Sequence, residues 1–229
     1  MSILPIDTGR YGTKEMLDIF KEQKKIDYQL DIEAAAALSQ SEIGLIPASI
    51  ARNISKIAKS GKITAKRIKQ LEAKSDHDTA ALVEALAEKC NKESRPWIHY
   101  GLTSNDLVDT SNSMQMRDAI KIIQPKVSKL SLLLSKNAIK HRSVPAVGRT
   151  HGQHASIISF GLKFANWAAE MSTHLERLDE IKKRVLICKT LGVVGTGSLM
   201  GKNAVKVQER VAKKLGLYSA KVTTQIIPR

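Results

Sequence analysis

The chain has 229 residues, 42% hydrophobic and 26% charged, as is ordinary for a globular protein, but only 4% aromatic, so its core must be aliphatic. Two cysteines are too few for a disulfide framework, no apolar run approaches the roughly 20 residues that span a bilayer, and the first residues lack a signal-peptide pattern. We therefore expect a cytoplasmic protein with no membrane partner. The net charge of +15 is uneven, because residues 181–229 hold eleven Lys or Arg and one acid, which fits an anionic partner or an acidic counterpart outside this chain.

The first hundred residues predict short helices joined by tight turns. Apolar residues recur there at helical spacing, and glycine or proline interrupts the pattern several times, the last breaks being Pro96 and Gly101. The predicted helices span residues 14–38, 47–61, 64–74 and 78–90. We expect residues 1–103 to form a helical N-terminal domain.

Two long helices are predicted after residue 103. The first fits residues 104–140, with apolar residues in steps of four and three, and Pro125 is expected to kink it without ending it. The second fits residues 157–185, and no strand pattern of any length competes. Helices of roughly 40–55 Å cannot bury their apolar seams within one small domain. We therefore expect residues 104–229 to be the first part of an extended bundle domain that other subunits complete.

A polar cluster leads directly into the first long helix, with the sequence His99-Tyr100-Gly101-Leu102-Thr103-Ser104. The N-terminus of a helix presents unpaired N–H groups and a partial positive charge. With the hydroxyl groups of Thr103 and Ser104, this end would suit a carboxylate or a phosphate. The alternative is that Ser104 is only the N-cap of the helix.

A second polar cluster covers residues 148–155, which we expect to form a loop between the two long helices. Glycine, threonine and glutamine flank His151 there, and this setting makes a general acid or base plausible. A metal site is the competing interpretation, because His154 follows three residues later. No Cys, Asp or Glu stands at ligand spacing, so we expect no metal.

Two further segments carry polar residues. His77 lies between Asp76 and Asp78 at a predicted helix start, as a third candidate for chemistry or as part of a capping cluster. The glycine-rich segment 195–202 misses the spacing of a phosphate-binding loop and no strand pattern precedes it. We interpret this segment as a tight connection between helices.

These clusters, in this order, resemble the adenylosuccinate lyases of the fumarase/aspartase superfamily. The resemblance implies an all-α fold of the fumarase/aspartase type, in which a short-helix N-terminal domain is followed by the long helices of an extended bundle. It also implies a homotetramer whose active sites are shared between subunits. The residues that carry it are Arg10-Tyr11, Asp76-His77-Asp78, His99 to Ser104, Gly148 to Gln153, and Thr224-Gln225.

The resemblance implies a β-elimination that releases fumarate from adenylosuccinate, giving AMP, and from SAICAR, giving AICAR, without a cofactor. A base removes a proton next to a carboxylate, and an acid protonates the departing nitrogen. The acid is the residue that matches His151, with His77 beside it. The resemblance assigns substrate binding to Arg10 and Tyr11 at the phosphate, Thr103 and Ser104 at a carboxylate, and Asp76, Asp78, His99, Gln153 and Gln225.

One departure from the family's pattern is large. The catalytic base of the family is a serine in a loop of the form Gly-Ser-Ser-x-Met-Pro-x-Lys-x-Asn-Pro, and the 229 residues contain no such stretch. We therefore expect this chain to be an N-terminal portion that ends before the loop and is inactive alone.

Two alternatives remain open beside this interpretation: another lyase of the superfamily, or a basic helical protein that binds nucleic acid or serves as a scaffold. A surface that binds a nucleic-acid backbone would not need histidines framed by glycine at helix junctions. These histidines therefore favour a lyase that acts on a small molecule and has no nucleic-acid partner.

Overall fold

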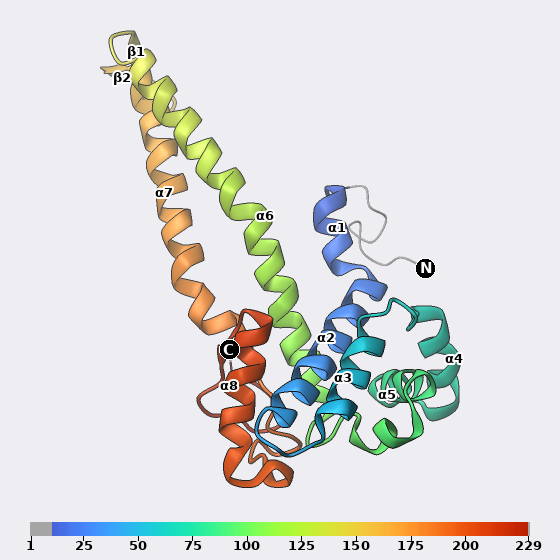
Figure 1. Ribbon diagram of the computed structural model, residues 1–229. Helices are drawn as coiled ribbons and strands as arrows, with labels where there is room; N and C mark the ends of the chain where they lie inside the picture. Colours follow the sequence, from blue (N-terminus) through green and yellow to red (C-terminus); the bar gives the residue numbers. More distant parts are fainter. Residues whose placement is uncertain (1–10, 229) are drawn as a thin grey trace. The chain divides into compact units, whose positions relative to one another are not determined.

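The computed structural model describes residues 11–228, which form mostly helices (Figure 1). This architecture confirms the all-α fold class, although two short pairs of strands accompany the helices. The elements in chain order are α1 Lys14–Phe20, α2 Glu22–Ser41, α3 Ala48–Ala58, α4 Ala65–Ser75, α5 Asp78–Lys89, η2 Lys92–Trp97, α6 Ser104–Lys140, β1 Pro145–Thr150, β2 Gln153–Ser159, α7 Phe160–Val185, β3 Ile187–Cys188, η3 Ser198–Asn203, α8 Ala204–Leu215 and β4 Tyr218–Ser219.

The described residues cluster into two compact units. The first unit holds the residues up to Asp118 and those from Lys183 onward, and the second holds Ala119–Lys182. Helix α6 contributes residues to both. The sequence predicts domains over residues 1–103 and 104–229. These domains stay a prediction.

Helix α2 lies at the centre of the first unit. It packs against α1, α3, α4 and α8, and accordingly it is buried on almost every side, including Ile32 and the alanines 34–37. Short alanine side chains let neighbouring helices approach closely. The sequence predicted one helix over residues 14–38, but Lys21 adopts an extended conformation, with φ −60° and ψ 143°, and separates α1 from α2. No glycine or proline marks this break.

Helix α8 packs against the rest of the first unit, including α2, through one apolar face. Val207 and Val211 on this face are fully buried, as their spacing of four predicts. Strands β3 and β4 pair in parallel beside α8, and the side chain of Gln208 joins them. Its Oε1 accepts the Thr190 N–H at 3.1 Å, and its Nε2 donates to Ser219 Oγ at 3.0 Å. The glycine-rich segment 195–202 connects β3 to α8.

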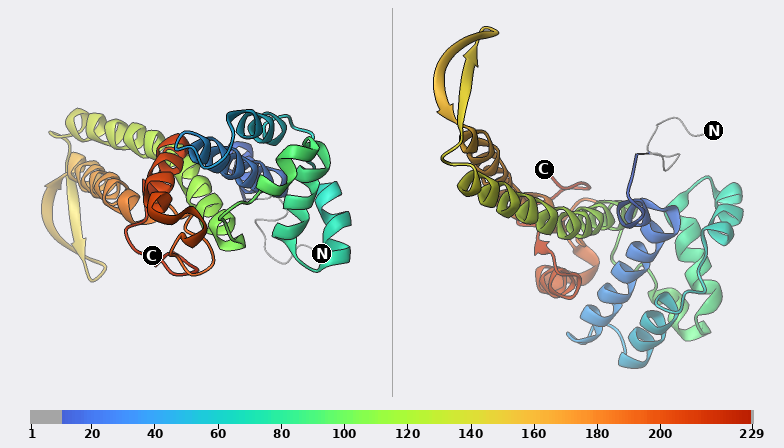
Figure 2. Two further views of the ribbon diagram at one scale, coloured as in Figure 1. Left: turned by 60° about the horizontal axis from the view of Figure 1, so that its bottom comes forward. Right: turned by 90° about the horizontal axis from the view of Figure 1, so that it is seen from above.

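In the second unit, the later part of α6 and helix α7 run side by side in opposite directions (Figures 1 and 2). The side chain of Gln124 on α6 donates to Asp179 Oδ1 on α7 at 3.0 Å, and Ser131 Oγ donates to Ala168 O at 3.5 Å. Helix α6 continues through Pro125, as predicted.

A β-hairpin joins these two helices, so the expectation of a loop over 148–155 without any strand is wrong. Strands β1 and β2 pair antiparallel, and the two residues between them, His151 and Gly152, have φ values of +52° and +73°. Positive φ at both positions is the geometry of a type I′ turn, whose twist matches that of a hairpin. Ile157 pairs with Val147 in this hairpin, so α7 begins at Phe160 and not at residue 157.

Gly161 allows the first turn of α7 to approach the end of α6 closely. A Cβ atom at this position would collide with the carbonyl oxygen of Ala138 and lie 3.0 Å from the backbone nitrogen of Arg142. Because these are backbone atoms, they cannot move aside cheaply. We expect Gly161→Ala to lower the free energy of unfolding by about 1–3 kcal/mol, as overpacking does, despite the better helix propensity of alanine.

Urea denaturation followed by circular dichroism measures this effect. The matched control is Lys163→Ala, an exposed position two residues further along α7, which should change the free energy of unfolding by no more than about 0.5 kcal/mol. Equal stability of Gly161→Ala and the unmodified chain would show that the close approach is not needed.

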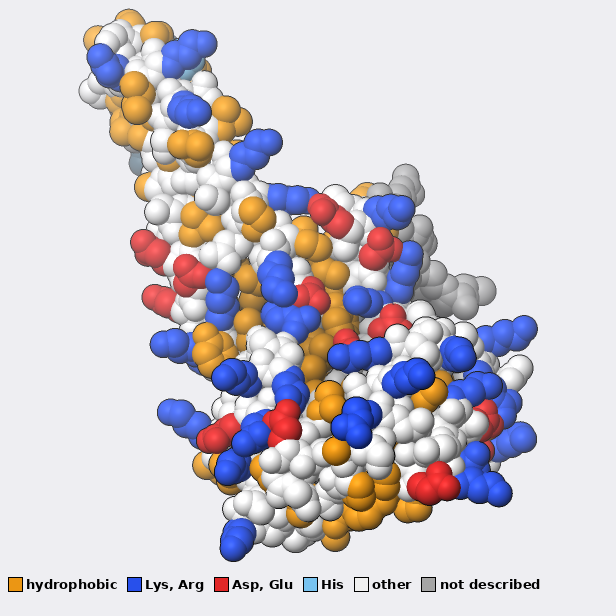
Figure 3. All heavy atoms as spheres, in the orientation of Figure 1, with side chains coloured by type: hydrophobic (Ala, Val, Ile, Leu, Met, Phe, Trp, Pro, Cys, Tyr) orange, Lys and Arg blue, Asp and Glu red, His pale blue; other side chains and the backbone are white. Residues whose placement is uncertain are grey.

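Much of the apolar surface of the second unit faces solvent. Ile157 is 81% exposed and Leu132 is 57% exposed, and Figure 3 shows hydrophobic side chains interspersed with basic ones along this unit. None of the helices within residues 11–228 is both long and apolar enough to cross a membrane. The other large exposed apolar residues of this unit are Ile123, Leu130, Leu133, Ile139, Val144, Val147, Leu162, Trp167 and Ile181.

Candidate active site

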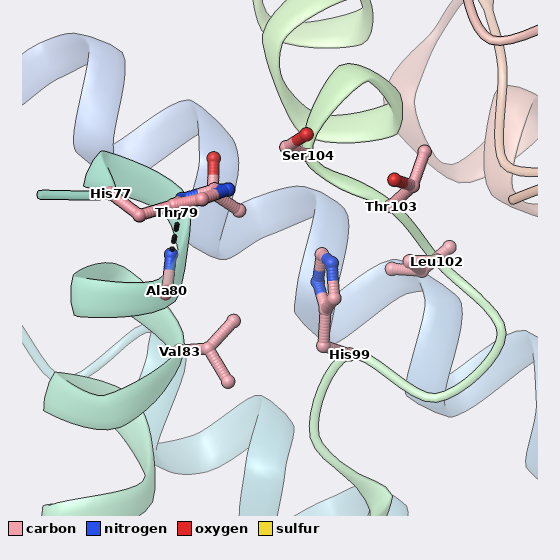
Figure 4. A pocket seen from close by; sticks show the side chains of 8 residues that line it. All are labelled: His77, Thr79, Ala80, Val83, His99, Leu102, Thr103 and Ser104. Atoms are coloured by element: carbon pink, nitrogen blue, oxygen red, sulfur yellow. Dashed lines mark hydrogen bonds between the residues drawn. The ribbon is translucent and has the colours of Figure 1, made fainter. Parts of the chain in front are cut away.

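A cavity of about 370 Å³ opens in the first unit, between the start of α5 and the segment that leads into α6 (Figure 4). An adjoining hollow of about 440 Å³ shares His77 and Ser104 with it. The cavity is lined by His77, Thr79, Ala80, Val83, His99, Leu102, Thr103 and Ser104, and the hollow also by Glu72, Asp76, Asp78, Asn105 and Val108. Six of the predicted site residues therefore lie together: Asp76, His77, Asp78, His99, Thr103 and Ser104.

His77 is both the N-cap of α5 and part of the cavity wall. Its Nδ1 accepts the backbone N–H of Ala80 at 3.2 Å, so in the neutral ring the proton is on Nε2. Asp76 precedes it in the left-handed conformation that ends α4, and Asp78 follows it in the first turn of α5. The capping role considered from the sequence is thus real, and it orients the histidine towards the cavity.

His99 is held by a buried carboxylate. Its Nδ1 lies 2.6 Å from Glu33 Oε1, and its backbone N–H donates to Glu33 Oε2 at 3.0 Å. The Glu33 side chain is only 2% exposed. Burial alone would lower the pKa of His99, but the hydrogen bond and charge of Glu33, with a contribution from Asp106, raise the pKa above its ordinary value.

Thr103 and Ser104 stand where α6 begins. The helix starts at Ser104, so the cap position before it belongs to Thr103, and the alternative of Ser104 as the N-cap is wrong. The Thr103 N–H donates to Asp106 Oδ2 at 3.0 Å, and the Asp106 N–H donates back to Thr103 O at 2.9 Å. This reciprocal pair fixes the end of the helix against the cavity.

Beneath this helix end, Asp106 forms a fully buried ion pair with Lys189. The Gly192 N–H donates to Asp106 Oδ2 at 2.9 Å, and Lys189 Nζ donates to Gly192 O at 3.0 Å. Burial raises the pKa of Asp106 despite the bonds from Lys189, Thr103 and Gly192. The network therefore joins the start of α6 to the segment after β3.

Neither Glu33 nor Lys189 was identified from the sequence as part of the site. Glu33 and His99 are 66 residues apart, and Asp106 and Lys189 are 83 residues apart. A buried carboxylate or ammonium group needs a partner, but the sequence does not show which residue supplies it.

The other predicted site residues lie outside the cavity and the adjoining hollow. His151 and Gln153 belong to the second unit, where both are exposed at the hairpin turn. Tyr11 is 72% exposed, and Gln225 is also exposed. Two residues after Gln225, the backbone N–H of Ile227 donates to Asp109 Oδ2 at 2.9 Å and holds this segment against α6. Arg10 lies outside the described residues.

Neither cysteine is poised as a nucleophile. Burial raises the pKa of Cys90 to about 11 and that of Cys188 to about 12, so both thiols are protonated near neutral pH. Within residues 11–228, no group of three or more His, Cys, Asp or Glu is placed to hold a metal ion. The polar side chains that line the cavity are therefore two imidazoles, the hydroxyls of Thr103 and Ser104 at the N-terminus of α6, and the hydroxyl of Thr79.

Comparison with known proteins gives a consistent picture. A family described as "Lyase" matches residues 9–228. Adenylosuccinate lyases from Methanocaldococcus jannaschii and Methanothermobacter thermautotrophicus are 43% and 40% identical over all 229 residues, which cover 49% and 51% of their lengths. The chain thus spans about half the length of these curated relatives. A fumarate lyase from Mesorhizobium sp. BNC1 has a similar structure, with a TM-score of 0.86 and 30% identity, covering 93% of this chain and 51% of that one.

Proposed function

We propose that the protein is an adenylosuccinate lyase, because the chain belongs to the lyase family that matches residues 9–228. It would release fumarate from adenylosuccinate, and from SAICAR by the same chemistry. The observation that carries this proposal is the cavity in which His77 and His99 face Thr103 and Ser104 at the N-terminus of α6. The similarity to two adenylosuccinate lyases over the whole chain supports it.

The binding step uses the helix end. A carboxylate of the succinyl group accepts hydrogen bonds from the hydroxyls of Thr103 and Ser104, and the partial positive charge of the N-terminus of α6 stabilises it. Asp76 and Asp78 lie in the adjoining hollow, where they would contact polar groups of the same substrate. Arg10, Tyr11, Gln153 and Gln225 would complete the binding set, with Arg10 and Tyr11 at the phosphate.

The chemical step is an elimination. A base takes the proton from the carbon next to a carboxylate, the electron pair forms the double bond of fumarate, and the carbon–nitrogen bond breaks. The departing nitrogen takes its proton from His151, with His77 beside it. These proton and electron-pair transfers need no cofactor. The base itself is assigned to a serine loop that is not among the 229 residues.

We propose a cytoplasmic homotetramer in which His151 serves the cavity of another subunit. His151 lies in the second unit and is exposed, whereas the cavity lies in the first. The exposed apolar residues of the second unit support an assembly, because extensive exposed apolar surface is characteristic of protein interfaces.

The test uses the protein expressed from its full reading frame. We expect stoichiometric release of fumarate and AMP from adenylosuccinate, and of fumarate and AICAR from SAICAR, followed by proton NMR. Fumarate released only from other succinyl compounds would make it a different lyase of the superfamily. No turnover of any of them, with salt-dependent binding to oligonucleotides, would instead support the nucleic-acid alternative.

Three of the eleven basic residues of the C-terminal stretch have acidic partners within the fold. Lys189 is buried against Asp106, and Arg210 and Lys214 both bond to Glu42, at 2.5 Å each. Lys189 is therefore not available to contact a phosphate backbone, whereas Arg210 and Lys214 lie in partly exposed surface pairs.

A further inference from the structure

We infer that Glu33 is a positioning residue for the cavity: it holds His99 as an imidazolium whose Nε2–H binds a substrate carboxylate. This inference rests on the proposed function and adds to it a residue that lines neither the cavity nor the adjoining hollow. Glu33 acts from the middle of α2, through His99.

The geometry of the pair supports a fixed orientation of the ring. The two oxygens of Glu33 bond to two groups of the same residue, the ring Nδ1 and the backbone N–H of His99. His99 adopts φ +61°, a left-handed conformation that a non-glycine residue rarely takes without support. The second hydrogen bond supplies that support. Figure 4 shows the ring lying among His77, Leu102 and Thr103 in the cavity.

The position of the proton follows from the bonding. An ionised carboxylate can only accept hydrogen bonds, so Nδ1 of His99 donates to an ionised Glu33. A neutral ring would then leave Nε2 as a bare acceptor, which repels a carboxylate. A protonated ring presents Nε2–H and a positive charge to the same carboxylate that Thr103 and Ser104 bind.

The charged groups around His99 favour the protonated ring. Glu33 on α2 is its closest anion, and Asp106 on α6 adds a weaker attraction while it is paired with Lys189. His77 faces the same cavity from α5. A buried carboxylate without a cation is costly, so Glu33 and a positively charged His99 stabilise each other.

The closing experiment follows the ring and a ligand directly, on the protein expressed from its full reading frame. NMR of ¹⁵N-labelled histidine reports the protonation of His99 between pH 5 and 9, and calorimetry measures the affinity for fumarate and, separately, for inorganic phosphate. In the unmodified chain we expect His99 to remain protonated at pH 7 and the fumarate affinity to change little between pH 6 and 7.5.

The variant Glu33→Gln removes the anion and keeps the size of the side chain. We expect His99 of this variant to lose its proton below pH 7, and the fumarate affinity at pH 7.5 to fall about tenfold to a hundredfold and to recover at lower pH. A merely structural role of Glu33 would not produce this recovery. The matched control is Glu22→Gln, the same substitution at the exposed start of α2, which should leave both measurements unchanged.

Three outcomes would overturn the inference. The first is a neutral His99 at pH 7 in the unmodified chain, which needs no variant and so decides the matter even if Glu33→Gln does not fold. The second is a pH profile of fumarate binding that Glu33→Gln leaves unaltered. The third is a higher affinity for phosphate than for fumarate, which would contradict the inference that His99 binds a carboxylate. Neither measurement requires turnover, so a failed fumarate-release assay and a failure here are read separately.

Discussion

Replacing Lys189 with methionine is expected to lower the free energy of unfolding by about 3–5 kcal/mol, because it leaves the carboxylate of Asp106 buried without its cation. Methionine keeps most of the apolar length of the lysine side chain, so packing changes little. Asp106 retains the N–H groups of Thr103 and Gly192, which cannot neutralise its charge. Chemical denaturation of the purified variant measures the loss.

The size of this loss should depend on pH. Without Lys189, the pKa of Asp106 in the folded variant rises further above that of the unfolded chain, so the folded state binds the extra proton. Stability of the variant relative to the unmodified chain therefore falls as pH rises above about 4, the ordinary value for Asp. We expect a larger deficit at pH 8 than at pH 5.

Two controls separate charge from packing. The double substitution Asp106→Asn with Lys189→Met removes both charges and should be more stable than Lys189→Met alone. Lys214→Met removes an equivalent charge from a surface pair with Glu42 and should cost no more than about 1 kcal/mol. A Lys189→Met variant as stable as Lys214→Met at pH 8 would mean that the buried pair is not formed.

Replacing His151 with glutamine is expected to lower kcat by about 10²–10⁴, the usual contribution of a positioned general acid. Glutamine occupies a similar volume and can still form hydrogen bonds, but it cannot transfer a proton to the departing nitrogen. His151 is exposed at the hairpin turn, so its loss should leave the cavity of the first unit and the fold intact. Fumarate release by the whole protein, with circular dichroism of the variant, measures both.

Backbone strain at the turn has to be separated from catalysis. His151 has φ +52°, a conformation that Asn tolerates better than Gln, so His151→Asn serves as a second variant without this penalty. His154→Gln, in the same hairpin, is the matched control and should keep most of the activity. Normal turnover by both variants at position 151 would defeat the assignment of the acid to His151.

The long helices and the all-α class could be predicted because their signal is local. Apolar residues at helical spacing define α6 to within the limits observed, and the short helices α3, α4 and α5 likewise follow their expected ranges. The break at Lys21 could not be predicted, since no glycine or proline marks it and the apolar spacing continues through it.

The hairpin was missed for a different reason. The two central positions of a type I′ turn are usually occupied by Asn-Gly or Asp-Gly, whereas His151-Gly152 occupies them here. Six residues around the cavity were named from their sequence clusters, but the buried partners that fix them were not. Glu33 and Lys189 come from distant segments, and only the folded chain brings them to His99 and Asp106.

The register of the hairpin limits how this protein can diverge. Thr150 pairs with Gln153, so His151 and Gly152 alone make the turn. One inserted residue would rotate the imidazole away from its present direction and exchange the two faces of a strand. Substitutions along β1 and β2 that keep this pairing leave the direction of the imidazole unchanged, whereas an insertion in the turn would alter it.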